Sequence, residues 1–224
     1  MMVGGVFYIK ECYEKTTGMI AEMFFFLSRA FFCLLKFWSL CAGTVIGNLK
    51  LHLWGCRCNG PVRCFGVPRI EMAASRQIEI GKNNIFRSSV ISNPVGICHP
   101  VYLATRGAGH IRIGDDCGLS GVSIISFSSV TIGNRVQIGA NTAIVDADFH
   151  PLDAASRAIP HATGKSAPIA IADDVFIGMN TLILKGVSIG RKSVIGAGSV
   201  VTKDIPSGVV AAGNPAQVIR KLDV

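Results

Sequence analysis

One histidine stands where acid–base chemistry is possible. His150 lies in the segment DADFHPLDAASRAIPHATGKSA, two residues after Asp148 and four after Asp146. Imidazole titrates near neutral pH, so it can take the proton of an attacking hydroxyl as a general base. Either carboxylate can accept the other ring N–H and hold the useful tautomer, and the sequence does not choose between them. The alternative is a loop histidine that makes only surface hydrogen bonds.

A repeat of six residues resumes after this segment. An aliphatic residue heads each of six consecutive hexapeptides: Ile171, Ile177, Ile183, Ile189, Ile195 and Val201. Neither a helix, with its period of 3.6, nor a single strand, with its period of 2, produces this interval. Six residues can form one short strand and one corner, and three such units close a triangular coil that stacks on the next. The sequence therefore predicts an all-β fold, a parallel β-helix of hexapeptide repeats.

The other repeat positions agree with such a coil. The fifth residues are small or β-branched, and Asp, Asn, Gly and Lys gather at the fourth, where a corner needs tight backbone geometry. Ile132, Ile138 and Ile144 continue the repeat towards the N-terminus. Ile91, Ile97 and Leu103 also share an interval of six, which predicts an earlier coil.

The histidine segment breaks this repeat. His150 is six residues after Ile144 and Lys165 is six before Ile171, and neither side chain suits a narrow aliphatic core. We therefore predict that the chain leaves the coil near Asp146 and returns by residue 169, forming a protruding loop over 146–169. Long loops on a rigid scaffold are where site residues tend to lie.

The N-terminal part predicts an apolar helix. Within residues 19–47 the charges are Glu22, Arg29 and Lys36, spaced by seven, so they form one stripe on a largely apolar helix. A helix lying at a membrane surface explains the stripe and the many aromatic residues. A helix packed against protein is the alternative, and a spanning helix is less favoured because Arg29 and Lys36 interrupt the apolar run. The predicted domains are 1–54 and 55–224, the second with a C-terminal tail over 207–224.

The net charge favours an anionic binding partner, and the cysteine spacing argues against a zinc site. The 224 residues carry a net charge of +8, which suits an anionic partner such as a phosphorylated cofactor or a lipid surface. No nucleic-acid-binding motif is present, so no nucleic acid is expected. The eight cysteines lack zinc-finger spacing, and we interpret them as reduced thiols of a cytoplasmic protein. The apolar helix is compatible with a place at the inner face of the cytoplasmic membrane.

Several motifs together resemble one known family. They are the DADFHPLD segment with its following arginine, the repeats, the AGSVVTKDIP segment that begins at residue 197, and the AGNPA segment that begins at residue 212. Over residues 110–222 the chain resembles the hexapeptide acyltransferases, in particular the galactoside/maltose O-acetyltransferases and the sugar O-acetyltransferases of surface-polysaccharide synthesis. The resemblance is weaker over 55–109 and absent in the N-terminal helix. It implies a left-handed β-helix, a homotrimer, acetyl-CoA bound between subunits, and His150 as the catalytic base.

The resemblance also implies contacts with acetyl-CoA. The backbone of Ala197 matches a position at the pantetheine arm, Thr202 and Lys203 match a turn near the adenine, and Arg220 matches a residue that meets the phosphates. Phe176 stands where the family usually has tryptophan, so an aromatic wall is kept.

Two positions depart from the family. Met179 stands where the family often has serine or glycine, and Gln217 stands where it often has arginine, so one phosphate contact is in doubt. Ser120, in a Leu-Ser-Gly-Val stretch, roughly matches a polar residue that binds the acceptor. Asp153 and Arg157 are expected to pair and shape the loop.

The favoured function is therefore O-acetyl transfer from acetyl-CoA to a sugar hydroxyl, in the synthesis of lipopolysaccharide, capsule or exopolysaccharide. A metalloenzyme of the γ-carbonic-anhydrase type needs three converging histidines, and the five histidines here lack the required spacing, so no metal is expected. A non-enzymatic β-helix that assembles at a membrane is the other alternative, and the intact His150 loop argues against it. The acceptor sugar, its hydroxyl and the acyl length are not encoded in any motif.

Overall fold

The computed structural model describes residues 3–160 and 162–223, so His161 lies outside the described residues. The chain forms two compact units, Met1–Trp38 and Ser39–Val224. Helix α1 (Val3–Leu53) begins in the first unit and ends in the second, and its side chains are described from Glu22 onward. The stretch Glu22–Leu53 is long and apolar enough to span a bilayer, judged by length and composition alone, with a mean hydropathy of 1.7.

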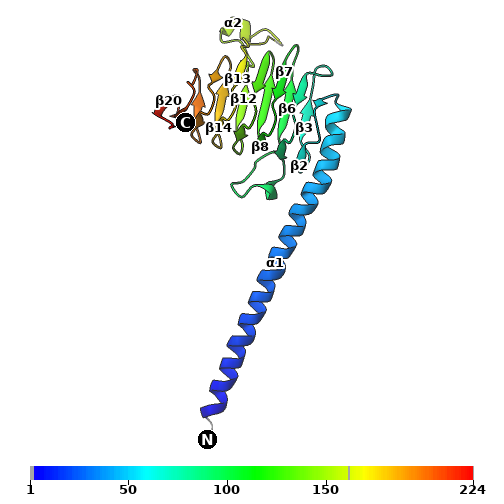
Figure 1. Cartoon of the computed structure of the whole chain (residues 1–224), viewed down its shortest axis with the longest axis vertical. Helices are drawn as coiled ribbons and strands as arrows, with labels where there is room; N and C mark the ends of the chain where they lie inside the picture. The colour runs from blue at the N-terminus through cyan, green and yellow to red at the C-terminus, as the bar shows by residue number, and fades with distance from the viewer. Residues whose placement is uncertain (1–2, 161, 224) are drawn as a thin grey trace. The chain divides into compact units, whose positions relative to one another are not determined.

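The second unit is a three-sided prism of stacked coils (Figure 1). The parallel β-helix predicted from the repeat is confirmed, and it is left-handed as the family resemblance implies. Sheet A contains β1 (Arg57–Cys58), β4 (Ile78–Ile80), β7 (His110–Ile113), β10 (Ser129–Ile132), β13 (Ile169–Ile171) and β16 (Ser188–Ile189). Sheet B contains β2 (Arg63–Phe65), β5 (Ile85–Arg87), β8 (Gly118–Ser120), β11 (Gln137–Ile138), β14 (Phe176–Ile177), β17 (Val194–Ile195), β19 (Val209–Gly213) and β20 (Ala216–Lys221). Sheet C contains β3 (Arg69–Glu71), β6 (Tyr102–Thr105), β9 (Ser123–Ser126), β12 (Ala143–Val145), β15 (Leu182–Leu184) and β18 (Val200–Val201).

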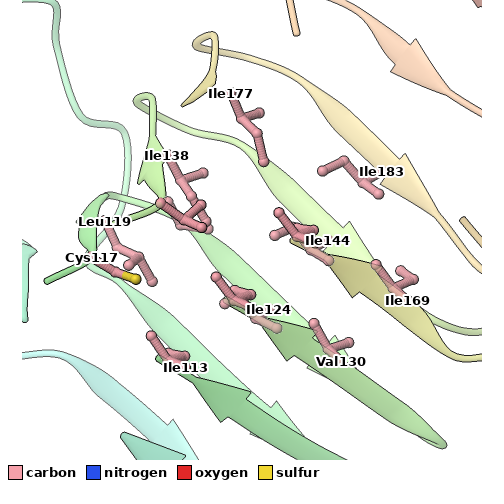
Figure 2. Packing of buried hydrophobic residues seen from close by; sticks show 14 of the residues in the cluster. Ile113, Cys117, Leu119, Ile124, Val130, Ile138, Ile144, Ile169, Ile177 and Ile183 are labelled. Carbon is pink, nitrogen blue, oxygen red and sulfur yellow. The ribbon is translucent and has the colours of Figure 1, made fainter. Parts of the chain in front are cut away.

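The core is a narrow column inside the prism. The aliphatic heads of the hexapeptides all point inward and are buried, with Ile144, Ile177 and Ile183 fully buried (Figure 2). The fifth residues of the hexapeptides are buried as well. Where these are polar, they bond to backbone carbonyls inside the corner, as when Thr181 Oγ1 donates to Gly178 O at 2.8 Å. Because these hydroxyls are satisfied, they are tolerated in an otherwise aliphatic interior.

The fourth residues of the hexapeptides explain how each coil turns. Asp174, Asn180 and Lys192 have φ of 61°, 55° and 59°, and Gly186 and Gly198 also have positive φ. This left-handed backbone conformation is one that Gly, Asn and Asp adopt at low cost, whereas most other residues are strained in it. The composition of the fourth position is therefore a direct consequence of the corner geometry.

The last turns of α1 cover the first coil. Asn48 pairs with both backbone groups of Val62: its Nδ2 donates to Val62 O at 2.8 Å, and its Oδ1 accepts from Val62 N at 2.9 Å. One turn away, Thr44 Oγ1 accepts from Cys64 N at 3.0 Å. A Cβ on Gly43 would lie 2.5 Å from Cys64 O, so the helix backbone approaches the strand closely. Two helical side chains thus replace the missing strand at the exposed edge of sheet B.

Two expectations about the N-terminal half are corrected. Residues 39–53 of α1 belong with the prism, so the structural boundary falls after Trp38 and not at residue 54. Ile91 does not head a coil: it lies in a short 3-10 helix, Val90–Ser92, within a loop over residues 88–101 between β5 and β6. Its interval of six to Ile97 is therefore accidental, although Ile97 and Leu103 are buried as expected.

Candidate active site

His150 lies on the predicted loop, where the chain passes from sheet C to sheet A. The loop occupies residues 146–168, between β12 and β13, and includes the short helix α2 (Ala154–Arg157), which projects beyond the strands in Figure 1. The His150 side chain is exposed and makes no hydrogen bond within the described residues. An exposed imidazole on a loop that is fixed to the prism is available to a substrate or to a second protein chain.

Asp146 does not orient this imidazole, contrary to one of the two expectations. Its carboxylate is fully buried and accepts from Ser126 Oγ at 2.7 Å, Phe127 N at 2.7 Å and Ser128 N at 2.9 Å. All these donors belong to the turn of the preceding coil. The residue faces inward because it directly follows strand β12, and its role is to hold the base of the loop.

Asp148 has another partner as well. Its Oδ1 pairs with Lys185 Nζ at 2.5 Å, so within this chain the carboxylate holds a lysine and not the imidazole of His150. The expected pair of Asp153 and Arg157 is also absent from the described contacts. Asp153 instead caps α2 by accepting from Ser156 N at 2.7 Å, and Arg157 donates to the carbonyl oxygens of Pro151 and Leu152.

Ser120, Met179 and Ala197 are brought into one column at the corner between sheets B and C. The backbone hydrogen bonds establish this register. Ser120 O accepts from Asn141 N, Ala140 O accepts from Asn180 N, and Met179 O accepts from Gly198 N. A Cβ on Gly178 would lie 2.4 Å from Ala197 N, so the successive corners are in close backbone contact. Ala197 is exposed and Met179 is half-buried on these adjacent corners, so both can be reached from solvent.

Phe176 lies beside this column on the outer face of sheet B. Its ring is 49% exposed, and with Ser120, Gln137 and Arg87 it lines a groove of about 200 Å³. The groove therefore offers an aromatic face together with hydroxyl, amide and guanidinium groups. A larger groove of about 680 Å³ on sheet A is lined by none of the predicted site residues.

The remaining predicted contacts lie elsewhere. Thr202 and Lys203 are exposed where the last coil passes from sheet C to sheet A, the same corner from which the His150 loop leaves. Arg220 is exposed on β20, which pairs antiparallel with β19. Within one chain, His150 and the Ser120–Ala197 column are thus attached to different corners, separated by sheet C.

The loop over residues 88–101, which the sequence did not predict, reaches the same column. Asn141 holds the loop with both ends of its amide: Oδ1 accepts from Cys98 N at 2.8 Å, and Nδ2 donates to Gly96 O at 3.1 Å. Arg87 adds a bond to Ser92 O at 2.8 Å. The signal available in the sequence was the Asn-Pro and Gly content of this stretch, which is typical of a loop.

The cysteines offer no metal site within the described residues. No group of three or more His, Cys, Asp or Glu side chains converges there. The thiols of Cys33, Cys41, Cys56, Cys58, Cys64, Cys98 and Cys117 are free. Burial raises the pKa of Cys56 and Cys64 to about 12, so both stay protonated, which disfavours metal ligation at neutral pH.

Comparison with known proteins agrees with this architecture. The family model described as the hexapeptide repeat of succinyl-transferase matches residues 110–145 and 168–203, so the gap in the match is the His150 loop. Among solved structures, the Bacillus cereus N-acyltransferase AntD, in complex with dTDP and 3-hydroxybutyryl-CoA, superposes with a TM-score of 0.60 over 79% of this chain and 88% of that one, at 17% identity. This likeness supports the fold alone.

Two curated relatives are closer in sequence. The Saccharomyces cerevisiae protein named "Putative acetyltransferase YJL218W" is 40% identical over 143 residues, which cover 61% of this chain and 71% of that protein. The galactoside O-acetyltransferase of Escherichia coli is 44% identical over 102 residues, which cover 46% of this chain. The match spans about half the length of the bacterial enzyme, 49%. On these grounds the chain belongs to the hexapeptide-repeat acyltransferase family.

Proposed function

We propose that this protein transfers an acetyl group from acetyl-CoA to a hydroxyl of a sugar or glycan. The observation that carries the proposal is the exposed imidazole of His150 on a loop fixed to the prism, in a chain of this family. The sequence similarity to a galactoside O-acetyltransferase favours a sugar as acceptor.

The chemistry needs one base and no covalent enzyme intermediate. His150 takes the proton of the acceptor hydroxyl while its oxygen attacks the thioester carbonyl, and a tetrahedral oxyanion forms. The oxyanion then collapses, the bond to sulfur breaks, and the imidazolium returns a proton to the CoA thiolate. A placed general base contributes on the order of 10²–10⁴ in rate. A backbone N–H of a neighbouring coil is a suitable donor to the oxyanion.

A second copy of the chain completes the site in this proposal. His150 and the column at the corner of sheets B and C lie on different corners of one prism, so His150 of one copy would face the column of the next. A homotrimer satisfies this arrangement for every copy at once, because the contact is head-to-tail and closes into a ring. The pantetheine arm would run along Met179 and Ala197, with Phe176 as a wall. Thr202 and Lys203 would lie towards the adenine, and Arg220 towards the phosphates.

The direct test is release of CoA thiol from acetyl-CoA in the presence of galactosides, glucosides and maltose. The expected result is acceptor-dependent release that falls at least a hundredfold in His150→Ala, with unchanged thermal melting because the side chain is exposed and makes no hydrogen bond within the described residues. Unchanged turnover in His150→Ala would overturn the proposed base. If no sugar is acetylated although CoA binds, a non-enzymatic assembly role would be favoured instead.

We also propose that the apolar helix holds the enzyme at the inner face of a membrane that carries lipid-linked glycans. The support is the surface of residues 23–38, where Phe24, Phe25 and Phe26 are more than 60% exposed. Arg29 and Lys36 add positive charge, each lying over a phenylalanine ring. Aromatic residues and basic charge favour a membrane interface. The acceptor would then belong to lipopolysaccharide, capsule or exopolysaccharide synthesis.

Flotation with lipid vesicles tests this placement. Replacing Phe24, Phe25 and Phe26 with serine should release the protein from vesicles that contain anionic lipid. A control with serine at Val90 and Val95, which are exposed on the loop over residues 88–101, should not. Failure of the unmodified protein to float would exclude membrane binding. Mass spectrometry of the surface glycan, with and without the active gene, would then identify the acetylated sugar.

A further inference from the structure

The proposed function does not explain what orients the His150 side chain, because neither Asp146 nor Asp148 makes a hydrogen bond to its ring in this chain. The strongest unexplained contact near the loop is the ion pair between Lys185 and Asp148. Lys185 Nζ lies 2.5 Å from Asp148 Oδ1, and the two side chains are 31% and 24% exposed. Lys185 follows strand β15 of the prism, whereas Asp148 precedes His150 by two residues. The pair therefore joins the rigid scaffold to the loop close to the imidazole.

The base of the loop is a short antiparallel neck. Ala147 and Ser166 form a bridge, Ala167 N donates to Asp146 O at 2.9 Å, and Asp148 N donates to Lys165 O at 2.9 Å. These bonds align the outgoing and returning segments of the loop with each other, but they do not by themselves fix the direction of the neck relative to the prism.

The neck is closed tightly at its far end. A Cβ on Gly164 would lie 2.5 Å from Asp148 O and 2.7 Å from His150 O, so the two segments are in backbone contact up to the histidine. A tilt of the neck must therefore carry the backbone of His150 with it.

The corner formed by Lys185 and Gly186 holds both segments of this neck. Gly186 N donates to Ala167 O on the returning segment at 3.1 Å, and the Lys185 ammonium holds Asp148 on the outgoing one. Gly186 has a φ of 79°, which turns the chain directly after the lysine. These two attachments lie on opposite segments of the neck. Together with the bonds from Asp146 to the preceding coil and the edge-to-face contact of Phe149 with Phe127, they set the direction of the neck.

We propose that Lys185 is a positioning residue for His150, acting through Asp148. This rests on the proposed function, in which His150 is the base. The ion pair is partly exposed, and ion pairs at a protein surface contribute little to global stability. A displacement of about 1 Å at the reacting centre can cost on the order of 10²-fold in rate. Loss of the pair should therefore appear in turnover and not in folding.

Three variants test this, and a fourth serves as a matched control. Lys185→Met should lower kcat at least tenfold, with the KM for acetyl-CoA within twofold of the original value and the melting temperature nearly unchanged. Lys185→Arg, which keeps the charge, and the exchanged pair Lys185→Asp with Asp148→Lys should each recover most of the loss. Lys82→Met, an exposed lysine at another corner, should change nothing.

Combining Lys185→Met with His150→Ala identifies the route of the effect. If the lysine acts only through His150, the double variant should be no slower than His150→Ala alone. A further loss in the double variant would show that Lys185 meets the substrate or acetyl-CoA directly and would overturn the proposal. An undiminished kcat in Lys185→Met would overturn it as well.

A measurement without catalysis keeps the proposal separate from the proposed function. Trypsin can cleave after Arg157 and Lys165 in the loop, and Lys185→Met should speed cleavage at both sites severalfold, whereas Lys185→Arg should not. If His150→Ala retains full turnover, the proposed base is wrong, yet faster cleavage would still show that Lys185 holds the loop. Unchanged cleavage together with unchanged turnover would show that the Lys185–Asp148 ion pair neither holds the loop nor positions His150.

Discussion

The buried carboxylate of Asp146 accepts a hydrogen bond from the Ser126 hydroxyl at 2.7 Å and thereby ties the first residue of the His150 loop to the preceding coil. Two backbone amides of the same turn, Phe127 N and Ser128 N, point at the same carboxylate. Asp146 is for this reason a structural residue, and the consequences of removing it differ from those of removing His150.

Asp146→Ala should destabilise the protein by about 3 kcal/mol, because it leaves buried donors without an acceptor at a cost of roughly 1–3 kcal/mol each. Urea unfolding followed by circular dichroism measures the change. Asp223→Asn, at an exposed position near the C-terminus, serves as the control and should be neutral. A stable but inactive Asp146→Ala protein would contradict this and would indicate that Asp146 takes part in catalysis.

The cover formed by α1 predicts a local effect of substitutions in the helix. Asn48→Ala should remove both bonds to Val62 and cost about 1–3 kcal/mol, since each net hydrogen bond contributes roughly 0.5–1.5 kcal/mol. Hydrogen exchange of the Val62 amide should become much faster. Ile46→Ala, half-exposed on the same helix, should leave that amide protected. Equal protection in both variants would mean that the first strand does not depend on the helix.

Acid should weaken the prism through two carboxylates. Hydrogen bonds from Arg106, Arg69 and Tyr102 lower the pKa of Glu71 from 4.5 to about 2. A hydrogen bond from Arg135, with a further one from Arg191, lowers the pKa of Asp174 from 3.8 to about 2. Because the folded state binds protons less readily, their stabilisation is complete above about pH 5 and is lost as the pH falls towards 2.

Melting temperatures between pH 5 and pH 2 test this prediction. Glu71→Gln should flatten the dependence, and added salt should weaken it because both groups lie near the surface. Glu79→Gln provides a comparison, since Glu79 also pairs with an arginine, Arg57, at the longer distance of 3.3 Å. A pH profile unaffected by Glu71→Gln would show that its ion pairs do not form in solution.

The corner geometry predicts a stabilising substitution. Lys192 has a φ of 59°, a conformation that costs a non-glycine residue about 1–2 kcal/mol. Lys192→Gly should remove this strain and, after the entropy cost of glycine, raise stability by about 0.5 kcal/mol. Lys192→Val should lower it. Lys82→Gly, at a corner position without positive φ, should be destabilising. The midpoints of urea unfolding of the three variants measure these changes in stability.

The repeat itself was predictable because its constraint is local and periodic. Ile171, Ile183 and Ile195 sit at fixed intervals since each coil has the same three sides, and a single aliphatic pattern describes all of them. The loop over 146–169 was predictable for the converse reason, because His150 and Lys165 cannot occupy that core. Only the final residue of the predicted span, Ile169, proved to belong to the next strand.

The parts that escaped prediction depend on contacts distant in sequence. Ile91 keeps the interval of six yet lies in a loop. That loop is held by a hydrogen bond from Cys98 N to Asn141, 43 residues further along the chain, and the interval of six gives no sign of this contact. Likewise, Asp146 and Asp148 look equivalent beside His150. Their partners, Ser126 and Lys185, lie on the preceding and the following coil, and only the stacking of coils brings them together.

Both long loops leave the prism where the chain turns, and the strands on either side keep their pairing, as β12 does with β9 and β15. A gene can therefore gain or lose codons at such a turn without shifting the phase of any downstream hexapeptide. Descendants of one ancestral scaffold can diverge in what they modify while inheriting an unaltered interior.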